Sequence, residues 1–199
     1  MQFQPVLILC AFIGYILGSL STGVIYSRHL GRDVRTRGSK NSGASNMMRV
    51  HGVRPGVLTF IGDCAKAIVS IALGYWLCGH DGAMVAGFFV ILGHNWPVFF
   101  GFKGGKGVAC STAVYILNFP AWGIISVVAC VATIFATKYI SLGSLVMSAL
   151  FLVLMLIFEP FIPAGLWALV LAVLAFARHH GNIQRLLNGT ERKIGQREK

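Results

Sequence analysis

Long apolar blocks, separated by short polar or basic stretches, dominate the pattern of hydrophobic positions along this chain. Each block is close to the roughly 20 residues that an α-helix needs to cross a bilayer. The pattern therefore predicts an all-α integral membrane protein. The clear blocks lie at residues 5–27, 56–79, 82–102, 121–137, 142–158 and 164–178.

A seventh apolar stretch, residues 107–118, is shorter than the others. It is followed by Asn118-Phe119-Pro120, a sequence that favours a break in a helix. The stretch predicts either a short tilted span or half of a re-entrant hairpin.

The placement of basic residues decides between these arrangements. Apart from Lys66, the 17 Lys and Arg residues fall in four places, and the other connections hold none. With seven spans every basic cluster lies on one side, which the positive-inside rule makes the cytoplasm. We therefore expect a bundle of seven transmembrane helices, with the N-terminus outside and the C-terminus cytoplasmic. Five spans plus a hairpin is the alternative.

This topology makes residues 1–199 a single membrane domain whose polar motifs share the cytoplasmic side. We expect these motifs in cytoplasmic segments rather than in the spans. The segments are the loops 28–55, 103–107 and 138–144 and the C-terminal tail 179–199.

Composition agrees with a membrane location. The chain is 56% hydrophobic and 12% charged, with a mean hydropathy of +0.73, whereas soluble domains carry about 25% charged residues. The net charge of +11 then belongs to the cytoplasmic face, where it signals topology and attracts anionic membrane lipids. No separate basic domain exists, so nucleic acid is not an expected partner. The five cysteines lie in or beside apolar runs, which predicts small buried side chains without disulfides.

Two glycine-containing segments have residues that suit phosphate. Residues 38–49, Gly-Ser-Lys-Asn-Ser-Gly-Ala-Ser-Asn-Met-Met-Arg, combine tight turns with hydroxyl and amide groups and end on Arg49, which can grip phosphate with two N–H groups. Residues 102–107, Phe-Lys-Gly-Gly-Lys-Gly, resemble an anion nest with mobile cations. They are not a Walker A loop, because Lys106 is followed by Gly107. A flexible basic loop and a snorkelling lysine pair are the alternative interpretations.

Three further groups of polar residues lie near span ends or inside a span. Ser141 and Ser144 begin a span, where free N–H groups bind anions, although an ordinary helix cap is an equal alternative. His179 and Asn182 share a helix face at the end of the last span; a plain cationic helix terminus is the alternative. Asp63 and Lys66 are spaced for an ion pair inside the hydrocarbon.

The sequence also excludes several kinds of site. No His is followed by Asp in the His-x4-Asp spacing of a common acyltransferase arrangement, and no Gly-x-Ser-x-Gly elbow is present. Only three acidic residues follow Asp81, too few for a magnesium cluster. We therefore expect phosphate to be held by Arg, Lys, His and backbone N–H groups, without metal or cofactor.

These motifs, in this order, resemble the bacterial acyl-phosphate:glycerol-3-phosphate acyltransferases of the PlsY type. Residues 38–49 resemble the signature Gly-Ser-Gly-Asn-x-Gly-Ala-Thr-Asn-x-x-Arg, and residues 93–108 match the second signature closely. A third resemblance joins His179-x-x-Asn182-Ile183 to Arg185-Leu186-Leu187 and Gly189-Thr190-Glu191. Asp63-x-x-Lys66 and Ser141-Leu142-x-Ser144 also have family counterparts. The departures are Lys40 for Gly, Ser45 for Thr, and Cys110 after the Gly–Lys loop.

The resemblance implies an enzyme of the bacterial inner membrane whose site faces the cytoplasm. It would transfer a fatty acyl group from acyl-phosphate to the sn-1 hydroxyl of glycerol 3-phosphate, giving lysophosphatidic acid and phosphate, the first step of phospholipid synthesis. No acyl-enzyme intermediate is expected, and other phospholipid-synthesis enzymes are possible contacts. A transporter of a phosphorylated small solute is the alternative function.

The resemblance also implies roles for single residues. Glycerol 3-phosphate would contact Ser39, Arg49, Lys106, His179 and Asn182, and the base would be His179 or, as we favour, a phosphate oxygen of the donor. Asp63, Lys66 and Glu191 would give structural support. The remaining substrate-binding residues, mainly for acyl-phosphate, are Asn41, Ser45, Asn46, His94, Lys103, Gly104, Gly105, Gly107, Ser141 and Ser144.

Overall fold

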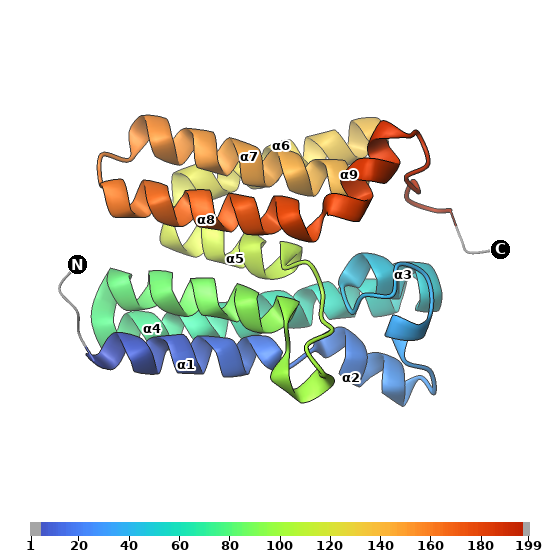
Figure 1. Cartoon of the computed structure of the whole chain (residues 1–199), viewed down its shortest axis with the longest axis horizontal. Coiled ribbons are helices and arrows are strands. Elements are labelled where there is room, and N and C mark those ends of the chain that lie inside the picture. The colour runs from blue at the N-terminus through green and yellow to red at the C-terminus, as the bar shows by residue number, and fades with distance from the viewer. Residues whose placement is uncertain (1–4, 197–199) are drawn as a thin grey trace. The chain divides into compact units, whose positions relative to one another are not determined.

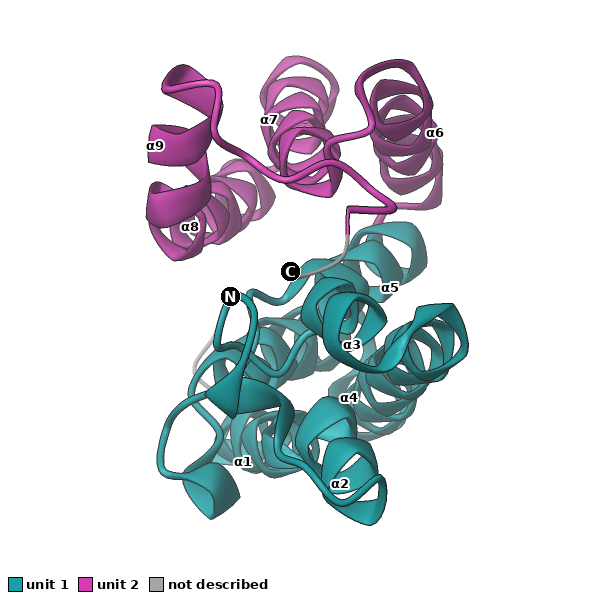
Figure 2. Cartoon of the chain, turned by 90° about the vertical axis from the view of Figure 1, so that its right-hand side faces the viewer, with its two compact units in different colours: residues 1–118, 197–199 teal, residues 119–196 magenta. Residues whose placement is uncertain are grey.

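The computed structural model describes residues 5–196, and within that range the chain forms helices and no strand (Figure 1). This confirms the all-α fold. The chain divides into two compact units, the first ending at Asn118 and the second covering Phe119–Gln196 (Figure 2). Residues 197–199 of the expected cytoplasmic tail lie outside the described residues. The single membrane domain stays a prediction.

The first unit is built around one long, sharply kinked helix, α4. Cys78 and Gly79 have non-helical backbone angles, and Gly79 has φ +57°, a region that glycine adopts without steric cost. The kink divides α4 into two helices near the expected connection at 80–82. The elements of this unit are α1 (Pro5–Ser19), α2 (Thr22–His29), η1 (Val34–Thr36), α3 (Ala44–His51), α4 (Val53–Asn95), η2 (Val98–Phe100) and α5 (Val108–Asn118).

Close backbone contacts hold α1 against α4. A Cβ atom at Gly18 would lie 2.3 Å from the backbone oxygen of Val90, and one at Gly93 would lie 2.2 Å from that of Tyr15. Only glycine fits such contacts, which are typical of packed membrane helices. These contacts place the end of α4, with the motif that follows it, beside the end of α1.

Two expected spans in this unit differ from the structure. The span 5–27 consists of α1 and α2, with Leu20 and Ser21 outside both helices. The expected span 82–102 was too long, because the helix ends at Asn95. Pro97 cannot continue it, since proline has no N–H and restricts the residue before it.

The second unit consists of four helices with prolines near two of their starts. Pro120 stands in the first turn of α6 and Pro163 in that of α8, where the missing N–H costs no hydrogen bond. Aromatic rings pack inside the unit, including a stacked pair, Trp122 and Phe158, with centroids 4.8 Å apart. The helices are α6 (Pro120–Thr137), α7 (Ile140–Phe158), α8 (Ile162–Arg178) and α9 (His180–Leu187).

Three of the expected cytoplasmic loops contain more helix than the sequence suggested. Residues 28–55 include η1, α3 and the start of α4; α7 begins at Ile140, inside 138–144; and α9 lies in the tail. Short helices α3 and α9 are amphipathic, so their apolar faces gain from packing that a loop would not have. Residues 103–107 are non-helical, as expected.

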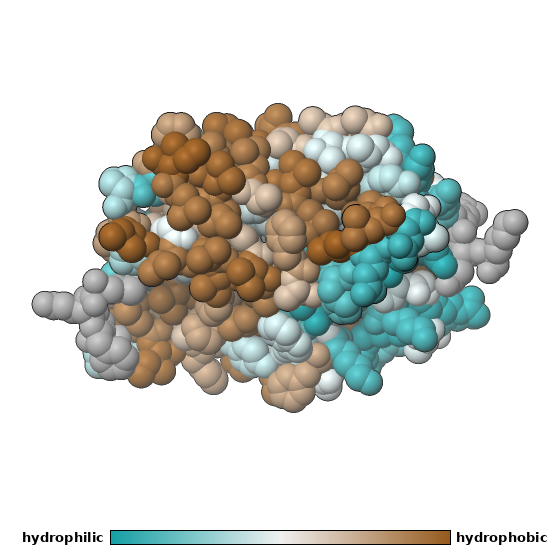
Figure 3. Space-filling model, turned by 45° about the horizontal axis from the view of Figure 1, so that its top comes forward, coloured by the Kyte–Doolittle hydropathy of each residue, from teal (hydrophilic) through white to brown (hydrophobic). Residues whose placement is uncertain are grey.

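Large apolar side chains are exposed on both units, as a lipid-facing surface requires. Phe12, Trp76, Phe135 and Ile162 are each more than 60% exposed, and Figure 3 shows a broad area of hydrophobic residues. Four described helical segments are long and apolar enough to cross a membrane, and the pair α8–α9, bent by 62°, would be a fifth. In this count the kinked α4 is a single segment. Seven spans and their orientation stay predictions.

All five cysteines are free. Cys10, Cys110 and Cys130 are buried, as expected, whereas Cys64 and Cys78 are only partly buried, which corrects the prediction of burial for those two. Their small, weakly polar side chains fill space between helices.

Candidate active site

The polar loop before α3 is organised around the buried side chain of Asn46. Its amide nitrogen donates to the carbonyls of Val34 (2.9 Å), Arg37 (3.1 Å) and Asn41 (2.8 Å). Its amide oxygen accepts from the N–H of Ser39 at 2.9 Å. We expected Asn46 to contact acyl-phosphate, but in this structure its side chain ties together the backbone of residues 34–41.

The rim of this loop carries the candidate ligands. Ser39 and Ser45 are exposed, and Asn41 bridges the loop, donating to Ser39 Oγ at 2.9 Å and accepting from the N–H of Gly43 at 3.0 Å. Lys40, which stands where the resembling family has Gly, has φ +56°. Arg49 is half-buried in the last turn of α3.

A buried ammonium joins the break between α1 and α2 to α4. Lys66 Nζ donates to the carbonyls of Gly18 and Leu20, both at 2.9 Å, and forms an ion pair with Asp63 Oδ1 at 2.9 Å. The expected ion pair is therefore present. The carbonyls at the end of α1 lack helical partners, and Lys66 supplies donors to two of them.

His94 connects this cluster to the Gly–Lys loop. Its Nδ1 lies 3.1 Å from Lys66 Nζ and 3.5 Å from Asp63 Oδ1. Its carbonyl accepts from the N–H of Gly105 at 3.1 Å, and a Cβ at Gly105 would lie 2.1 Å from its Nε2. His94 therefore sits under the loop and limits residue 105 to glycine.

The Gly–Lys loop, residues 103–107, presents two lysines above buried glycines. Gly104, Gly105 and Gly107 are buried, Lys106 is half-buried and Lys103 is exposed. Lys103 therefore lies toward solvent and Lys106 at the boundary, while the glycines let the backbone pass close to His94. Cationic side chains on a glycine-rich backbone can bind and neutralise a phosphate.

Sequence reasoning missed two residues that join the first loop to this one. Arg35 Nη1 donates to the carbonyls of Phe100 at 2.7 Å and Lys103 at 3.3 Å, and Asp33 grips the rest of the guanidinium, the shortest contact being 2.8 Å. The available signal was an acid and an arginine two residues apart, with Asp33 the one acidic residue within the basic stretch 28–54.

In the second unit, Glu191 gathers polar side chains from α7 and α9. Ser141 Oγ and Asn182 Nδ2 donate to Oε1 at 2.8 Å and 2.6 Å, and Arg185 Nε donates to Oε2 at 2.7 Å. Burial disfavours the charged carboxylate, but these hydrogen bonds outweigh it and lower the pKa of Glu191. The arrangement fits the supporting role expected for Glu191.

His179 lies at the junction of α8 and α9 and is buried. Its Nδ1 is 2.7 Å from the carbonyl of Ala175, and because a carbonyl only accepts, Nδ1 carries a proton. The neutral ring then has its lone pair on Nε2, and this nitrogen can accept a proton or a hydrogen bond from a substrate hydroxyl. Ser144 donates within its own helix, to Ile140 O at 2.9 Å, so its hydroxyl proton is directed away from any anion.

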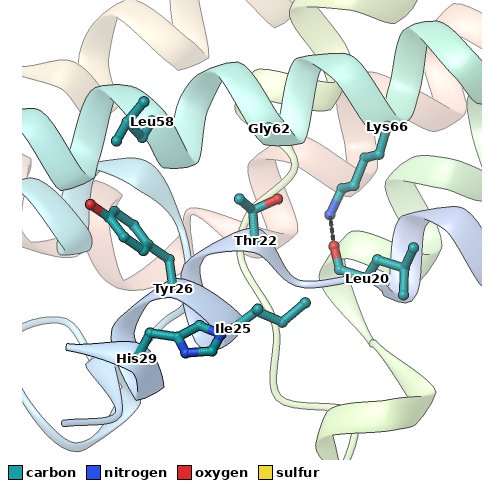
Figure 4. Close-up of a pocket in the computed structure, with 8 residues that line it drawn as sticks. All are labelled: Leu20, Thr22, Ile25, Tyr26, His29, Leu58, Gly62 and Lys66. Atoms are coloured by element: carbon teal, nitrogen blue, oxygen red, sulfur yellow. Dashed lines mark hydrogen bonds between the residues drawn. The ribbon is translucent and has the colours of Figure 1, made fainter. Parts of the chain in front are cut away.

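An apolar groove of about 430 Å³ runs between α2 and the part of α4 that precedes its kink (Figure 4). In Figure 4, Lys66 stands at one end, with its ammonium turned to the carbonyl of Leu20. The lining residues are Leu20, Thr22, Ile25, Tyr26, His29, Leu58, Gly62 and Lys66.

The two units thus assemble different parts of the expected site. Contacts of Asn46, Arg35 and Lys66 bring together the parts of the site in the first unit: the loop 38–46, His94, Asp63, Lys66 and the Gly–Lys loop. The second brings Ser141, Asn182 and Glu191 together. The individual substrate contacts that we expected remain predictions.

The sequence is similar to known proteins over almost its whole length. The family model described as glycerol-3-phosphate acyltransferase matches residues 8–189. A glycerol-3-phosphate acyltransferase of Thermoanaerobacter sp. (strain X514) is 41% identical over 191 residues, 96% of each chain. One of Clostridioides difficile (strain 630) is 38% identical over 200 residues, covering 96% of this chain and 97% of the relative.

Solved structures give the same result. A crystal structure of PlsY (YgiH), an integral membrane glycerol 3-phosphate acyltransferase, in its glycerol 3-phosphate form has a TM-score of 0.89 and 32% identity, covering 96% of both chains. The lysophosphatidic acid form of PlsY has a TM-score of 0.86 and 31% identity, with the same coverage. This chain therefore belongs to the PlsY family of integral membrane glycerol-3-phosphate acyltransferases.

Proposed function

We propose that this protein transfers a fatty acyl group from acyl-phosphate to the sn-1 hydroxyl of glycerol 3-phosphate. The products are lysophosphatidic acid and inorganic phosphate. The observation that carries the proposal is the first unit's assembly of the Gly–Lys loop and the loop before α3, joined by Arg35, in a chain of the PlsY family. The glycerol 3-phosphate and lysophosphatidic acid forms of the similar structures support this substrate and product.

Charge balance supports two phosphorylated substrates. Each phosphate carries about −1.5 to −2 charges at neutral pH, so the pair brings roughly −3 to −4. Arg49, Lys103 and Lys106 supply three formal positive charges, and His179 can supply a fourth when protonated. A site with this balance holds both anions without a metal ion.

We propose that glycerol 3-phosphate contacts Ser39, Arg49, Lys106, His179 and Asn182. Arg49 suits the phosphate because its planar fork donates two parallel hydrogen bonds. Asn182 donates to Glu191 through Nδ2, which directs its amide oxygen to act as an acceptor for a glycerol hydroxyl. Glu191 holds Asn182 in place, and Ser141 donates to the same carboxylate oxygen.

Acyl-phosphate is assigned to the backbone N–H groups of residues 104–107, to Lys103, and to the exposed rim of the loop before α3. Backbone N–H groups bind oxyanions without moving, so they stabilise the charge that develops on the leaving phosphate. Asn46 serves this site by shaping the loop, because its amide is bonded to the backbone on both sides.

In the proposed reaction, the sn-1 hydroxyl oxygen attacks the acyl carbonyl carbon. The new ester bond forms as the bond between that carbon and the bridging oxygen breaks, and phosphate leaves with the bonding electron pair. The hydroxyl proton passes to a phosphate oxygen of the donor, with His179 holding and orienting glycerol 3-phosphate. His179 as general base is the alternative. Neither route forms an acyl-enzyme intermediate.

Metal-independent chemistry is part of the proposal. The carboxylates of Asp33, Asp63 and Glu191 are each bonded to cationic or hydrogen-bonding partners of the chain itself. Recruiting them to a magnesium ion would break those bonds.

We further propose seven membrane spans in the bacterial inner membrane, with the N-terminus outside and the site facing the cytoplasm. The positions of the basic clusters support this orientation. Glycerol 3-phosphate is water-soluble and reaches the site from the cytosol, whereas the acyl chain of the donor remains among membrane helices.

Assays with purified protein distinguish acyl transfer from transport of a phosphorylated solute. In detergent with palmitoyl phosphate and glycerol 3-phosphate, wild type should form lysophosphatidic acid and Lys106→Ala should lose most of that turnover. Wild-type turnover no greater than that of Lys106→Ala would refute the proposed enzymatic activity. Accumulation of glycerol 3-phosphate in sealed proteoliposomes, without chemistry, would establish the transporter instead.

Two variants test the residue assignments. Arg49→Ala should lose most activity while keeping a normal thermal unfolding midpoint, because Arg49 binds substrate. Near-normal turnover would show that the glycerol 3-phosphate site is misplaced. His179→Gln tests the base: substantial remaining rate supports the substrate-assisted route, and loss of turnover with unchanged glycerol 3-phosphate binding would instead assign the base to His179.

A further inference from the structure

The segment between Pro97 and Val108 carries both lysines of the candidate site but has little regular structure. Gly101 and Phe102 have φ +65° and +59°, so the backbone turns sharply before the Gly–Lys loop. Its backbone hydrogen bonds include those of Phe100 and Phe102 to Pro97 O, and that of Gly105 to His94 O. A segment so built needs support from side chains to keep one conformation.

Arg35 supplies such support from the other loop. Its Nη1 donates to the carbonyl of Phe100, just before the turn, at 2.7 Å and to that of Lys103, just after the turn, at 3.3 Å. One nitrogen therefore holds both ends of the turn. The guanidinium carbon also lies 6.0 Å from the centroid of the Phe100 ring, within the range of a cation–π contact.

Asp33 fixes the guanidinium in that position. Its carboxylate accepts from Arg35 Nε at 3.1 Å and from Nη2 at 2.8 Å. It also caps η1 by accepting from the backbone N–H of Arg35 at 2.9 Å. Hydrogen bonding to Arg35 lowers the pKa of Asp33 to about 2, so the pair is charged at neutral pH. Both side chains are mostly buried, at 17% and 21% exposure.

We propose that Arg35, held by Asp33, is a positioning residue for acyl transfer that sets the conformation of residues 100–106 and so aims Lys103 and Lys106. The link to acyl transfer rests on the proposed function, whereas the contact between Arg35 and residues 100–106 does not. Arg35 acts through the loop and need not touch either substrate.

The geometry requires arginine rather than any cation. A guanidinium is a planar fork with five N–H donors in fixed directions, so one edge grips Asp33 while the remaining nitrogen reaches two carbonyls. Lysine has one compact ammonium and cannot satisfy both groups at these separations. Arg35→Lys keeps the positive charge but removes the hydrogen bonds to the two carbonyls. The variant therefore distinguishes the positioning of the loop from a simple effect of charge.

Arg37→Gln is the matched control, because Arg37 is exposed and lies two residues from Arg35 on the same loop. It changes the net charge by the same amount as Arg35→Gln. Amide hydrogen exchange of peptides covering residues 96–107 reports the conformation of the loop directly. We expect faster exchange in Arg35→Gln and Arg35→Lys, through loss of the protection at Phe102 and Gly105, and wild-type exchange in Arg37→Gln.

Kinetics give the second readout. Misplacing a catalytic group by about 1 Å can cost roughly 100-fold in rate, so we expect kcat to fall by about 10- to 100-fold in both Arg35 variants. The KM for acyl-phosphate should rise as well, whereas the unfolding midpoint should change little. Asp33→Asn should reproduce the effect, and Asp33→Asn/Arg35→Gln should be no worse than Arg35→Gln alone, since the two residues act as one unit.

The two readouts distinguish the possible failures. Wild-type exchange rates in Arg35→Gln would show that Arg35 does not hold the conformation of residues 100–106. Faster exchange with unchanged kinetic constants would overturn its role in catalysis. Absence of acyl transfer by wild type would refute the proposed function, while the exchange result would still decide whether Arg35 holds the segment.

Discussion

Lys66→Met removes the ammonium that joins α4 to the end of α1 and to the break before α2, while keeping a side chain of similar length. The change leaves Asp63 buried beside His94, whose Nδ1 lies 3.5 Å from Asp63 Oδ1. It also removes the donor to the carbonyls of Gly18 and Leu20. The expected result is a large loss of stability with the fold otherwise intact.

The magnitude follows from these contacts. Breaking a buried ion pair by removing one partner costs about 3–5 kcal/mol, and His94 at 3.5 Å can carry compensating charge, which favours the lower end. Two membrane hydrogen bonds add about 1 kcal/mol together. The sum is about 4 kcal/mol. For a chain of this size that corresponds to a fall in the unfolding midpoint of roughly 8–16 °C.

The protein's own cysteines provide the assay. Cys10, Cys110 and Cys130 are buried and free, so a thiol-reactive fluorogenic dye reports their exposure during a thermal ramp in detergent. Lys193→Met, at an exposed position, is the control and should leave the midpoint within about 2 °C, since surface substitutions rarely exceed 0.5 kcal/mol.

A double variant tests the reason for the loss. If the cost comes from an uncompensated buried carboxylate, Asp63→Asn/Lys66→Met should recover more than half of the lost midpoint. A midpoint in Lys66→Met within 2 °C of wild type, or a double variant as unstable as the sum of the single ones, would show that the buried ion pair is not the source of this stability.

Other predictions concern the loops and Glu191. Glu191→Gln should lower the unfolding midpoint and make that midpoint depend less on pH in acid. The pKa of Glu191 in the folded protein is lowered from 4.5, so the stability that its carboxylate contributes is complete above pH 4.5 and is lost as the pH falls through the folded pKa. The same pH dependence in wild type and variant would contradict this. Lys40→Gly should be tolerated or stabilise by up to about 1 kcal/mol, because Lys40 has φ +56°, whereas Lys40→Val should destabilise; a reversed order in thermal unfolding would argue against that turn. Gly105→Ala should lose most turnover, since its Cβ would lie 2.1 Å from His94 Nε2, while Gly165→Ala, a helical position of α8 whose Cβ would lie 3.4 Å from Leu156 Cδ2, should retain it; equal activity would show that the loop can shift.

The long apolar helices could be predicted because each depends on local sequence, whereas the short helices η1, α3 and α9 could not. Apolar blocks of spanning length indicated the helices, and the i, i+3 spacing of Asp63 and Lys66 indicated their ion pair. Pro120 and Pro163 lie where proline begins a helix. The Gly–Lys loop was recognisable because its lysines and glycines are adjacent in sequence.

Features that depend on distant contacts could not be predicted. The break at Leu20 has no glycine or proline beside it, and it is stabilised by an ammonium 46 residues away. Asn46 looked like a ligand, but the fold turns its amide inward to the backbone. Arg35 looked like one cation among many, and its function depends on where residues 100 and 103 come to lie.

In the proposed mechanism the protein holds both phosphorylated substrates together, and the glycerol hydroxyl attacks the acyl carbonyl without a covalent enzyme intermediate. Initial rates of lysophosphatidic acid formation, measured with purified protein while both substrates are varied, test this mechanism. Direct transfer predicts double-reciprocal lines that intersect. Parallel lines, the pattern of a covalent acyl-enzyme that releases phosphate before the second substrate binds, would contradict it.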